Sequence, residues 1–100
     1  MIRIVLTTFS DQETAARIVG ALVSENLAAC GTILPGARSI YRWKEKIEDT
    51  AEVVVIFKIT AATEDVFIKR LVELHPYDVP EAISIEPARV HEAYARWVLG

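Results

Sequence analysis

The feature that most constrains this 100-residue sequence is a run of five apolar residues, Val53 to Phe57. β-branched and aromatic residues favour strands, in which successive side chains point to opposite faces of a sheet. A strand that is apolar at every position therefore needs apolar cover on both faces. A single chain of this length buries roughly 65% of its unfolded-state surface and leaves about 5,700 Å² exposed. Because so small a core cannot cover both faces, we expect part of the cover to come from a second copy of the chain.

Four segments are predicted to be strands because they concentrate β-branched and aliphatic residues. They are Ile2 to Phe9, Leu27 to Trp43, Ala51 to Ile59 and Ala82 to Glu86. Pro35 and Gly36 predict a bulge or bend within the second segment, because proline removes a donor from the strand ladder. Residues 44–50 are charged and contain neither glycine nor proline. We therefore expect a loose hairpin connection there rather than a two-residue turn.

Three helices are predicted from apolar residues at helical spacing. The first follows Ser10 and Glu13, which have the spacing of a capping box, and ends near Asn26. The second has Thr63 as its N-cap and ends before Pro76, which restricts the backbone of the preceding residue. The last opens at Pro87. Its apolar face consists of Val90, Tyr94, Trp97 and Val98.

The resulting order of elements is βαββαβ followed by an extra helix, which is typical of an α+β, ferredoxin-like sandwich. Residues 1–100 form one domain of this kind, because chains divide into domains only at greater length. Two helices cover one face of an antiparallel sheet in this architecture, and the other face stays bare. Together with the doubly apolar third strand, the bare face predicts a homo-oligomer.

Several segments, in this order, resemble the CutA family of divalent-cation tolerance proteins. They are residues 27–30 (LAAC), Pro35-Gly36, residues 39–43 (SIYRW), Lys58, residues 75–81 (HPYDVPE) and residues 94–97 (YARW). The resemblance covers nearly the whole chain. It implies a ferredoxin-like subunit in a compact, very stable homotrimer, whose long second and third strands reach across to neighbouring subunits. It also implies tolerance to copper and other divalent metals, with copper binding in several members and no established enzymatic reaction.

Two residues are candidate metal ligands, His75 and Cys30. An imidazole nitrogen suits copper, nickel or zinc, and a thiolate suits copper(I). Cys30 lies among apolar residues, which also favours a buried structural thiol. Some family members carry a second histidine directly before His75 and a cysteine in the first strand, where this sequence has Leu74 and Thr7. We therefore expect weak or inter-subunit binding of copper or another divalent cation, and no required cofactor.

The resemblance also suggests a cleft around His75 that includes polar and aromatic side chains from distant parts of the sequence. Its candidate members are Trp43, Lys58, Tyr77, Glu81 and Tyr94. A structural interpretation stands beside this one. Lys58 and Glu81 would then form an ion pair, Tyr94 would pack within the last helix, and Trp43 would contact another subunit. From sequence, structural networks and functional sites look the same.

Charge and cysteine content exclude several classes of function. The formal net charge of −3 gives nucleic acid no electrostatic reason to bind, and one cysteine forms no internal disulfide. No stretch is long and apolar enough for a membrane span, so we expect a cytoplasmic protein.

Other functions of the same fold also lack their signatures. The third strand has one aromatic residue and no glycine, unlike an RNA-recognition module. Residues 7–11 contain neither the arginine nor the glycine of an acylphosphatase-like phosphate loop. The sequence therefore favours a non-enzymatic trimer acting in metal tolerance. The alternatives are a small-ligand-binding regulatory trimer like the PII proteins, weakened by the short hairpin without glycine, and a purely structural scaffold.

Overall fold

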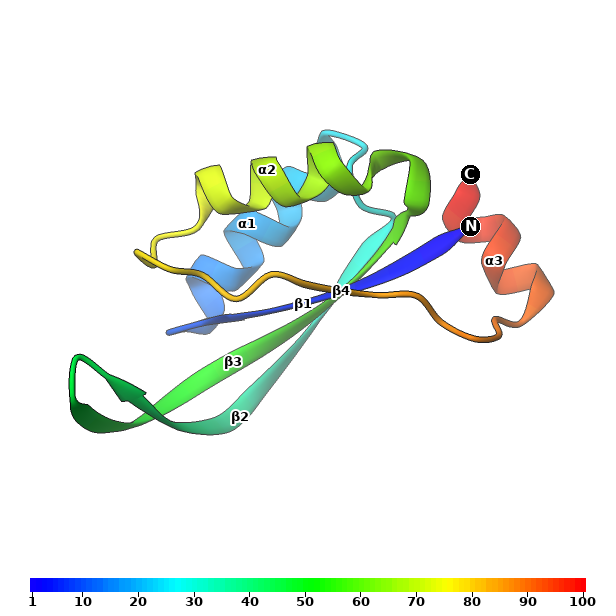
Figure 1. The fold of residues 1–100 in the computed structure, drawn as a ribbon. Coiled ribbons are helices and arrows are strands. Elements are labelled where there is room, and N and C mark those ends of the chain that lie inside the picture. The colour runs from blue at the N-terminus through cyan, green and yellow to red at the C-terminus, as the bar shows by residue number, and fades with distance from the viewer.

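In a computed structural model that describes all 100 residues, the chain forms a four-stranded antiparallel sheet with three α-helices (Figure 1). The elements in chain order are β1 (Ile2–Phe9), α1 (Gln12–Ser24), β2 (Cys30–Trp43), β3 (Lys46–Thr60), the 3₁₀ turn η1 (Ala61–Thr63), α2 (Glu64–Leu74), β4 (Ile83–Ile85) and α3 (Glu92–Leu99). The strand order is β2-β3-β1-β4. This arrangement confirms the predicted ferredoxin-like βαββαβ fold with an additional C-terminal helix.

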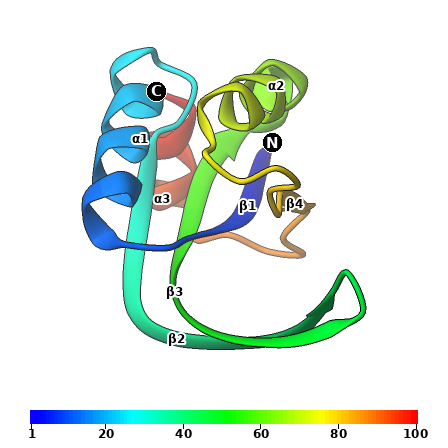
Figure 2. The ribbon, with the colours of Figure 1, turned by 90° about the vertical axis from the view of Figure 1, so that its left-hand side faces the viewer.

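One face of the sheet is covered by α1 and α2, which lie next to each other on the same side (Figures 1 and 2). The pairing register places Val5 opposite Phe57 and Phe9 opposite Val53, and all four side chains are buried. The two helices add further buried side chains to this core: Ala15, Ile18, Val19, Leu22, Phe67 and Leu71. We call this side the covered face.

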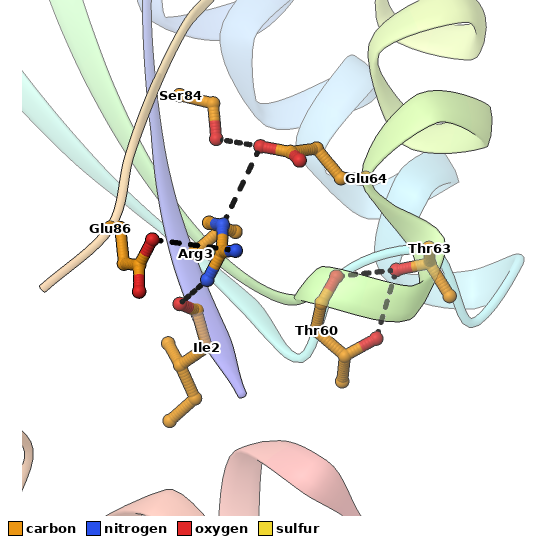
Figure 3. A network of polar contacts seen from close by, with 7 residues as sticks. All are labelled: Ile2, Arg3, Thr60, Thr63, Glu64, Ser84 and Glu86. Atoms are coloured by element: carbon orange, nitrogen blue, oxygen red, sulfur yellow. Dashed lines mark hydrogen bonds and ion pairs between the residues drawn. The ribbon is translucent and has the colours of Figure 1, made fainter.

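The opposite side, the open face, receives cover only from α3. That helix contacts β1 and β3 near the N-terminus (Figure 1), and Ile2, 7% exposed, points toward it (Figure 3). The rest of the open face is mainly apolar, and its apolar side chains are half-buried or exposed. Its apolar residues are Ile4, Leu6, Leu34, Val54, Ile56, Ile83 and Ile85. The expectation of a bare second face is confirmed for the single chain.

The outer halves of β2 and β3 form a hairpin that projects from the rest of the subunit (Figure 1). The bulge predicted at Pro35 and Gly36 is present, because the register shifts between Leu34 and Ala37 and Gly36 has φ 88°. The subunit is 44 Å long, its radius of gyration is 14.1 Å, and its accessible surface is 6492 Å². A compact monomer of this size has about 13 Å and about 5,700 Å². The chain thus exposes more surface than a compact monomer of its size would.

The tip of the hairpin is a two-residue turn, so the predicted loose connection is wrong. Trp43 pairs directly with Lys46, and the intervening Lys44 and Glu45 have φ values of 49° and 68°. Left-handed backbone costs a residue other than glycine roughly 1–2 kcal/mol. The paired outer parts of β2 and β3 support this strained turn. The prediction was wrong because it assumed that a two-residue turn requires glycine.

The starts of the helices differ from prediction in two places. Asp11 rather than Ser10 caps α1, because its carboxylate accepts a 2.7 Å hydrogen bond from the backbone N–H of Thr14. The last helix begins at Glu92 rather than Pro87. Residues 86–91 are not helical, because the chain must travel from the edge strand β4 to the part of β1 and β3 that α3 contacts.

A polar cluster around Arg3 joins β1, α2 and the segment after β4 (Figure 3). The Arg3 guanidinium lies 3.8 Å from the carboxylate of Glu64 and 3.6 Å from that of Glu86. The Ser84 hydroxyl also donates to Glu64. Thr63 precedes α2 as predicted, but its hydroxyl donates to the carbonyl of Thr60 instead of capping the helix. These contacts connect the short strand β4 and the residues after it to β1 and α2.

Candidate functional site

A cavity lies between the projecting hairpin and the segment after α2, and we call it the hairpin hollow. Its volume is about 600 Å³. It is lined by Thr8, Ser10, Tyr41, Trp43, Glu48, Thr50, Ala51, Glu52, Tyr77, Asp78, Val79 and Glu81. The hollow brings together three members of the predicted cleft, Trp43, Tyr77 and Glu81.

Sequence reasoning missed other side chains of the hollow, Tyr41, Glu48, Glu52 and Asp78 among them. Tyr41 pairs with Glu48 across the hairpin, and side chains at alternate positions of paired strands share one face. The sequence pattern that could have revealed these residues is therefore the placement of aromatic and acidic residues at alternate positions of the two strands. It could be interpreted only with the tight turn, which fixes the register of the hairpin.

His75 is a buried ring next to the hollow, and it contacts β1 and the segment after α2. Its imidazole stacks on Phe9 with the ring centroids 4.4 Å apart. Nε2 donates to the carbonyl of Thr8 at 2.8 Å, and Nδ1 accepts from the backbone N–H of Tyr77 at 3.1 Å. Burial lowers the pKa of His75, although the bond to Thr8 and the charge of Glu52 partly oppose this. The ring is therefore neutral near pH 7 and holds the Tyr77 backbone in place.

The phenol of Tyr77 fixes one wall of the hollow. Its hydroxyl donates a 2.6 Å hydrogen bond to the carboxylate of Glu52 on β3. Burial and this bond raise the pKa of Tyr77, so the phenol remains protonated and continues to donate. His75, Tyr77 and Glu52 thus connect the end of α2 to the hairpin.

The remaining predicted residues lie toward the other end of β3. Lys58 and Cys30 are cross-strand partners, and the sulfur of Cys30 lies 3.8 Å from the hydroxyl of Tyr94 on α3. Burial, followed by the contact with Cys30, raises the pKa of Tyr94. Cys30 itself is only partly buried. Within one subunit, the predicted cleft is therefore two separate groups of residues.

Lys58 does not form the ion pair with Glu81 that the structural interpretation expects. Its ammonium donates instead to the hydroxyl of Thr32 at 2.8 Å. Glu81 lies at the hairpin hollow, toward the opposite end of β3 from Lys58. The two charges are thus too far apart along the sheet to neutralise each other within one subunit.

A single subunit offers no ready-made metal site. No group of three or more His, Cys, Asp or Glu side chains is placed to hold a metal ion. Both ring nitrogens of His75 are already hydrogen-bonded, so metal coordination would require one of these bonds to break. The donor set of one chain therefore does not fit a pre-formed copper site.

The same fold occurs in proteins of known family. Residues 3–100 match the family model described as CutA1 divalent ion tolerance protein. The chain belongs to the CutA1 family. Two divalent-cation tolerance proteins named CutA are similar to it. The Thermus thermophilus protein is 38% identical over 98% of this chain and 95% of its own length, and the Pyrococcus horikoshii protein is 42% identical over 96% and 93%.

A solved structure of CutA from Xylella fastidiosa superimposes on the chain with a TM-score of 0.94 and 41% identity, covering 98% of this chain and 94% of that one. The structure of the Thermus thermophilus protein gives a TM-score of 0.92 with 38% identity, covering 98% of this chain and 95% of that one. This CutA1-family chain has no helix with the length and apolar character needed to cross a bilayer.

Two positions at which the resemblance implies metal ligands in some family members, Thr7 and Leu74, lie in or against the core of this chain. Thr7 is fully buried on the covered face, and its hydroxyl has no hydrogen-bond partner. Leu74 is half-buried and packs against the core. Neither side chain supplies a thiolate or an imidazole. Any metal site of this protein must therefore differ from a site built on those ligands.

Proposed function

We propose that this chain acts in divalent-cation tolerance as a non-enzymatic, cytoplasmic homotrimer that requires no cofactor. The observation that carries the proposal is the apolar open face. Ile83 and Leu34 are 51% and 43% exposed there, and the projecting hairpin also carries exposed apolar side chains. Apolar surface of this extent is typical of a subunit interface.

Closure of three subunits around their open faces would bury this surface. It would also cover the strand edges, which otherwise invite uncontrolled pairing with other chains. The hairpin is so long that the backbone N–H and C=O groups of its outer part lie beyond the core of its own subunit. It therefore supports the same assembly. Since burial of the open face depends on assembly, the midpoint of unfolding should rise with protein concentration.

We propose that the trimer binds copper(II), either weakly or between subunits. The binding depends more on His75 than on Cys30. Copper(II) prefers nitrogen and oxygen donors in a tetragonal arrangement. His75 must release either Thr8 or Tyr77 to bind a metal, which lowers its affinity. A neighbouring subunit would have to supply further donors. Copper(I) would shift the preference toward the partly buried thiol of Cys30.

Titration calorimetry with copper(II) tests this part of the proposal. The wild type should bind copper measurably, His75→Ala should lose most of the affinity, and Cys30→Ala should retain it. The exposed imidazole of His91 provides the matched control, so His91→Ala should bind like the wild type. Unchanged affinity in His75→Ala would remove His75 from the site. Absence of binding in the wild type would leave a trimeric scaffold whose connection to metals is indirect.

A small-ligand-binding regulatory trimer is a second candidate, and the hairpin hollow favours it. A cavity of about 600 Å³ falls within the range of small-molecule sites, about 300–1,000 Å³. Aromatic and polar side chains line it together, which is typical of such sites. In a protein of this kind, the trimer would provide the rigid structure and the hollow would bind the regulatory ligand.

A further inference from the structure

The side of β3 that belongs to the open face changes in character along the strand. Side chains alternate between the two faces of a strand, and the bulge at Pro35 and Gly36 interrupts only β2. Alternate residues of β3 therefore share one face throughout. From the hairpin toward α3, the residues on the open face are Glu48, Thr50, Glu52, Val54, Ile56 and Lys58. This face thus carries negative charge at one end, apolar residues in the middle and positive charge at the other end.

Lys58 is a half-buried cation with no carboxylate partner in its own chain. Its neighbours on the adjacent strands are Ile4 and Cys30, and its ammonium donates to the hydroxyl of Thr32 at 2.8 Å. A second subunit that covers the open face removes water from this ammonium. The burial of a charge is costly unless an opposite charge lies against it. The open face therefore favours a partner that brings a carboxylate to Lys58.

Glu48 is the carboxylate of the chain that best meets this requirement. Several carboxylates form no side-chain hydrogen bond or ion pair within the subunit, namely Glu13, Glu45, Glu48, Asp65, Asp78 and Glu81. Of these, only Glu48 is half-buried and lies on β3, on the face that carries Lys58. The two residues are about 33 Å apart along the strand, at about 3.3 Å per residue. They can therefore meet only if they belong to different subunits.

We propose that Lys58 of one subunit pairs with Glu48 of the next subunit, so that the open faces join head to tail. The proposal rests on the proposed trimer, and head-to-tail contacts are those that close into rings. The projecting hairpin carries Glu48 beyond the core of its own subunit, where a neighbour can reach it (Figure 1). Val54 and Ile56, which lie between the two charges, are buried in the same contact. Because Glu48 also lines the hairpin hollow, this contact places the hollow at the boundary between two subunits.

Reversal of the two charges tests the pair. Lys58→Glu should raise the concentration at which half of the trimer dissociates by about tenfold or more, because two carboxylates then face each other. Addition of Glu48→Lys should restore most of the lost association. Addition of Glu45→Lys is the matched control and should restore none, because Glu45 lies in the turn of the same hairpin, outside β3. Sedimentation equilibrium measures the association, and circular dichroism checks that each variant is folded. No rescue by Glu48→Lys, or equal rescue by both additions, would overturn the proposal.

Neutral variants provide a second measurement that does not depend on the folding of a charge-reversed chain. Lys58→Met and Glu48→Gln should each weaken the trimer, because each leaves the other charge unpaired in the interface. The double variant should be no weaker than either single variant, since neither charge remains. Additive effects of the two substitutions in a trimeric protein would overturn the pair alone. A monomeric wild type would contradict the proposed trimer itself, and the pair with it.

Discussion

The two faces of β3 differ in burial although their residues are of the same kind. Val53, Val55 and Phe57 are at most 5% exposed beneath α1 and α2. Val54 and Ile56 alternate with them and are only half-buried. Full burial of a valine or isoleucine side chain stabilises by about 1.5–3 kcal/mol, and the open face has gained only part of this. The covered face is complete within one chain, and the open face retains unburied apolar surface, which the proposed trimer would bury.

The largest expected effect comes from an aspartate at either of two adjacent positions of β3. Val55→Asp places an unpaired charge in the fully buried core, costs about 4 kcal/mol or more, and should leave the chain unfolded. Ile56→Asp places the same charge on the open face, so the subunit should fold but remain monomeric. Circular dichroism and light scattering measure the two outcomes. A folded Val55→Asp variant would show that the two faces are assigned the wrong way round.

A moderate effect is expected at Gly31, where β2 passes beneath α1. A Cβ atom there would lie 2.8 Å from Cγ1 of Val19 and 3.0 Å from the ring of Phe57. Gly31→Ala should therefore cost about 1–3 kcal/mol, measured by denaturant unfolding. Gly20 on α1 has open space around it, so Gly20→Ala should stabilise by about 0.5–1 kcal/mol. Equal effects at both positions would contradict the close packing of the covered face.

The fold was more accessible from the sequence than the site. The apolar run at residues 53–57, the amphipathic helices and the bulge at Pro35 depend on local pattern, and the structure has them all. The hairpin turn did not follow from the sequence, because tertiary pairing supports Lys44 and Glu45 in a conformation that their types disfavour. That error concealed the register of the hairpin and, with it, the hairpin residues of the hollow's lining other than Trp43.

The division of the predicted cleft has a different cause. Trp43 and Tyr94 lie near opposite ends of the sheet, and nothing in the spacing of the sequence encodes that separation. The resemblance could thus name candidate residues for a cleft, but their arrangement could not be derived from the sequence.

The smallest expected effect is a dependence of stability on pH through His75, which packs on Phe9 of the covered face. Its pKa in the folded protein lies below the ordinary value of 6.5, so the unfolded state binds more protons as the pH falls. The free energy of unfolding should be constant above about pH 7 and decrease as the pH falls through 6.5 and then through the lower folded pKa.

Substitution by glutamine tests this assignment. His75→Gln can keep an acceptor for Tyr77 and a donor for Thr8 without titrating, so it should flatten the profile between about pH 5 and pH 7. His91→Gln should leave the profile unchanged, because that imidazole is exposed. An unchanged slope in His75→Gln would assign the pH dependence to other groups.

The mass of the wild-type protein in solution tests the open face as a subunit interface most directly. Light scattering at micromolar concentration should give three times the chain mass of 11.2 kDa, and the Ile56→Asp variant should give the mass of one chain. A wild type that remains a stable 11.2 kDa monomer at that concentration would contradict the account, because its apolar open face would then be stable in contact with water.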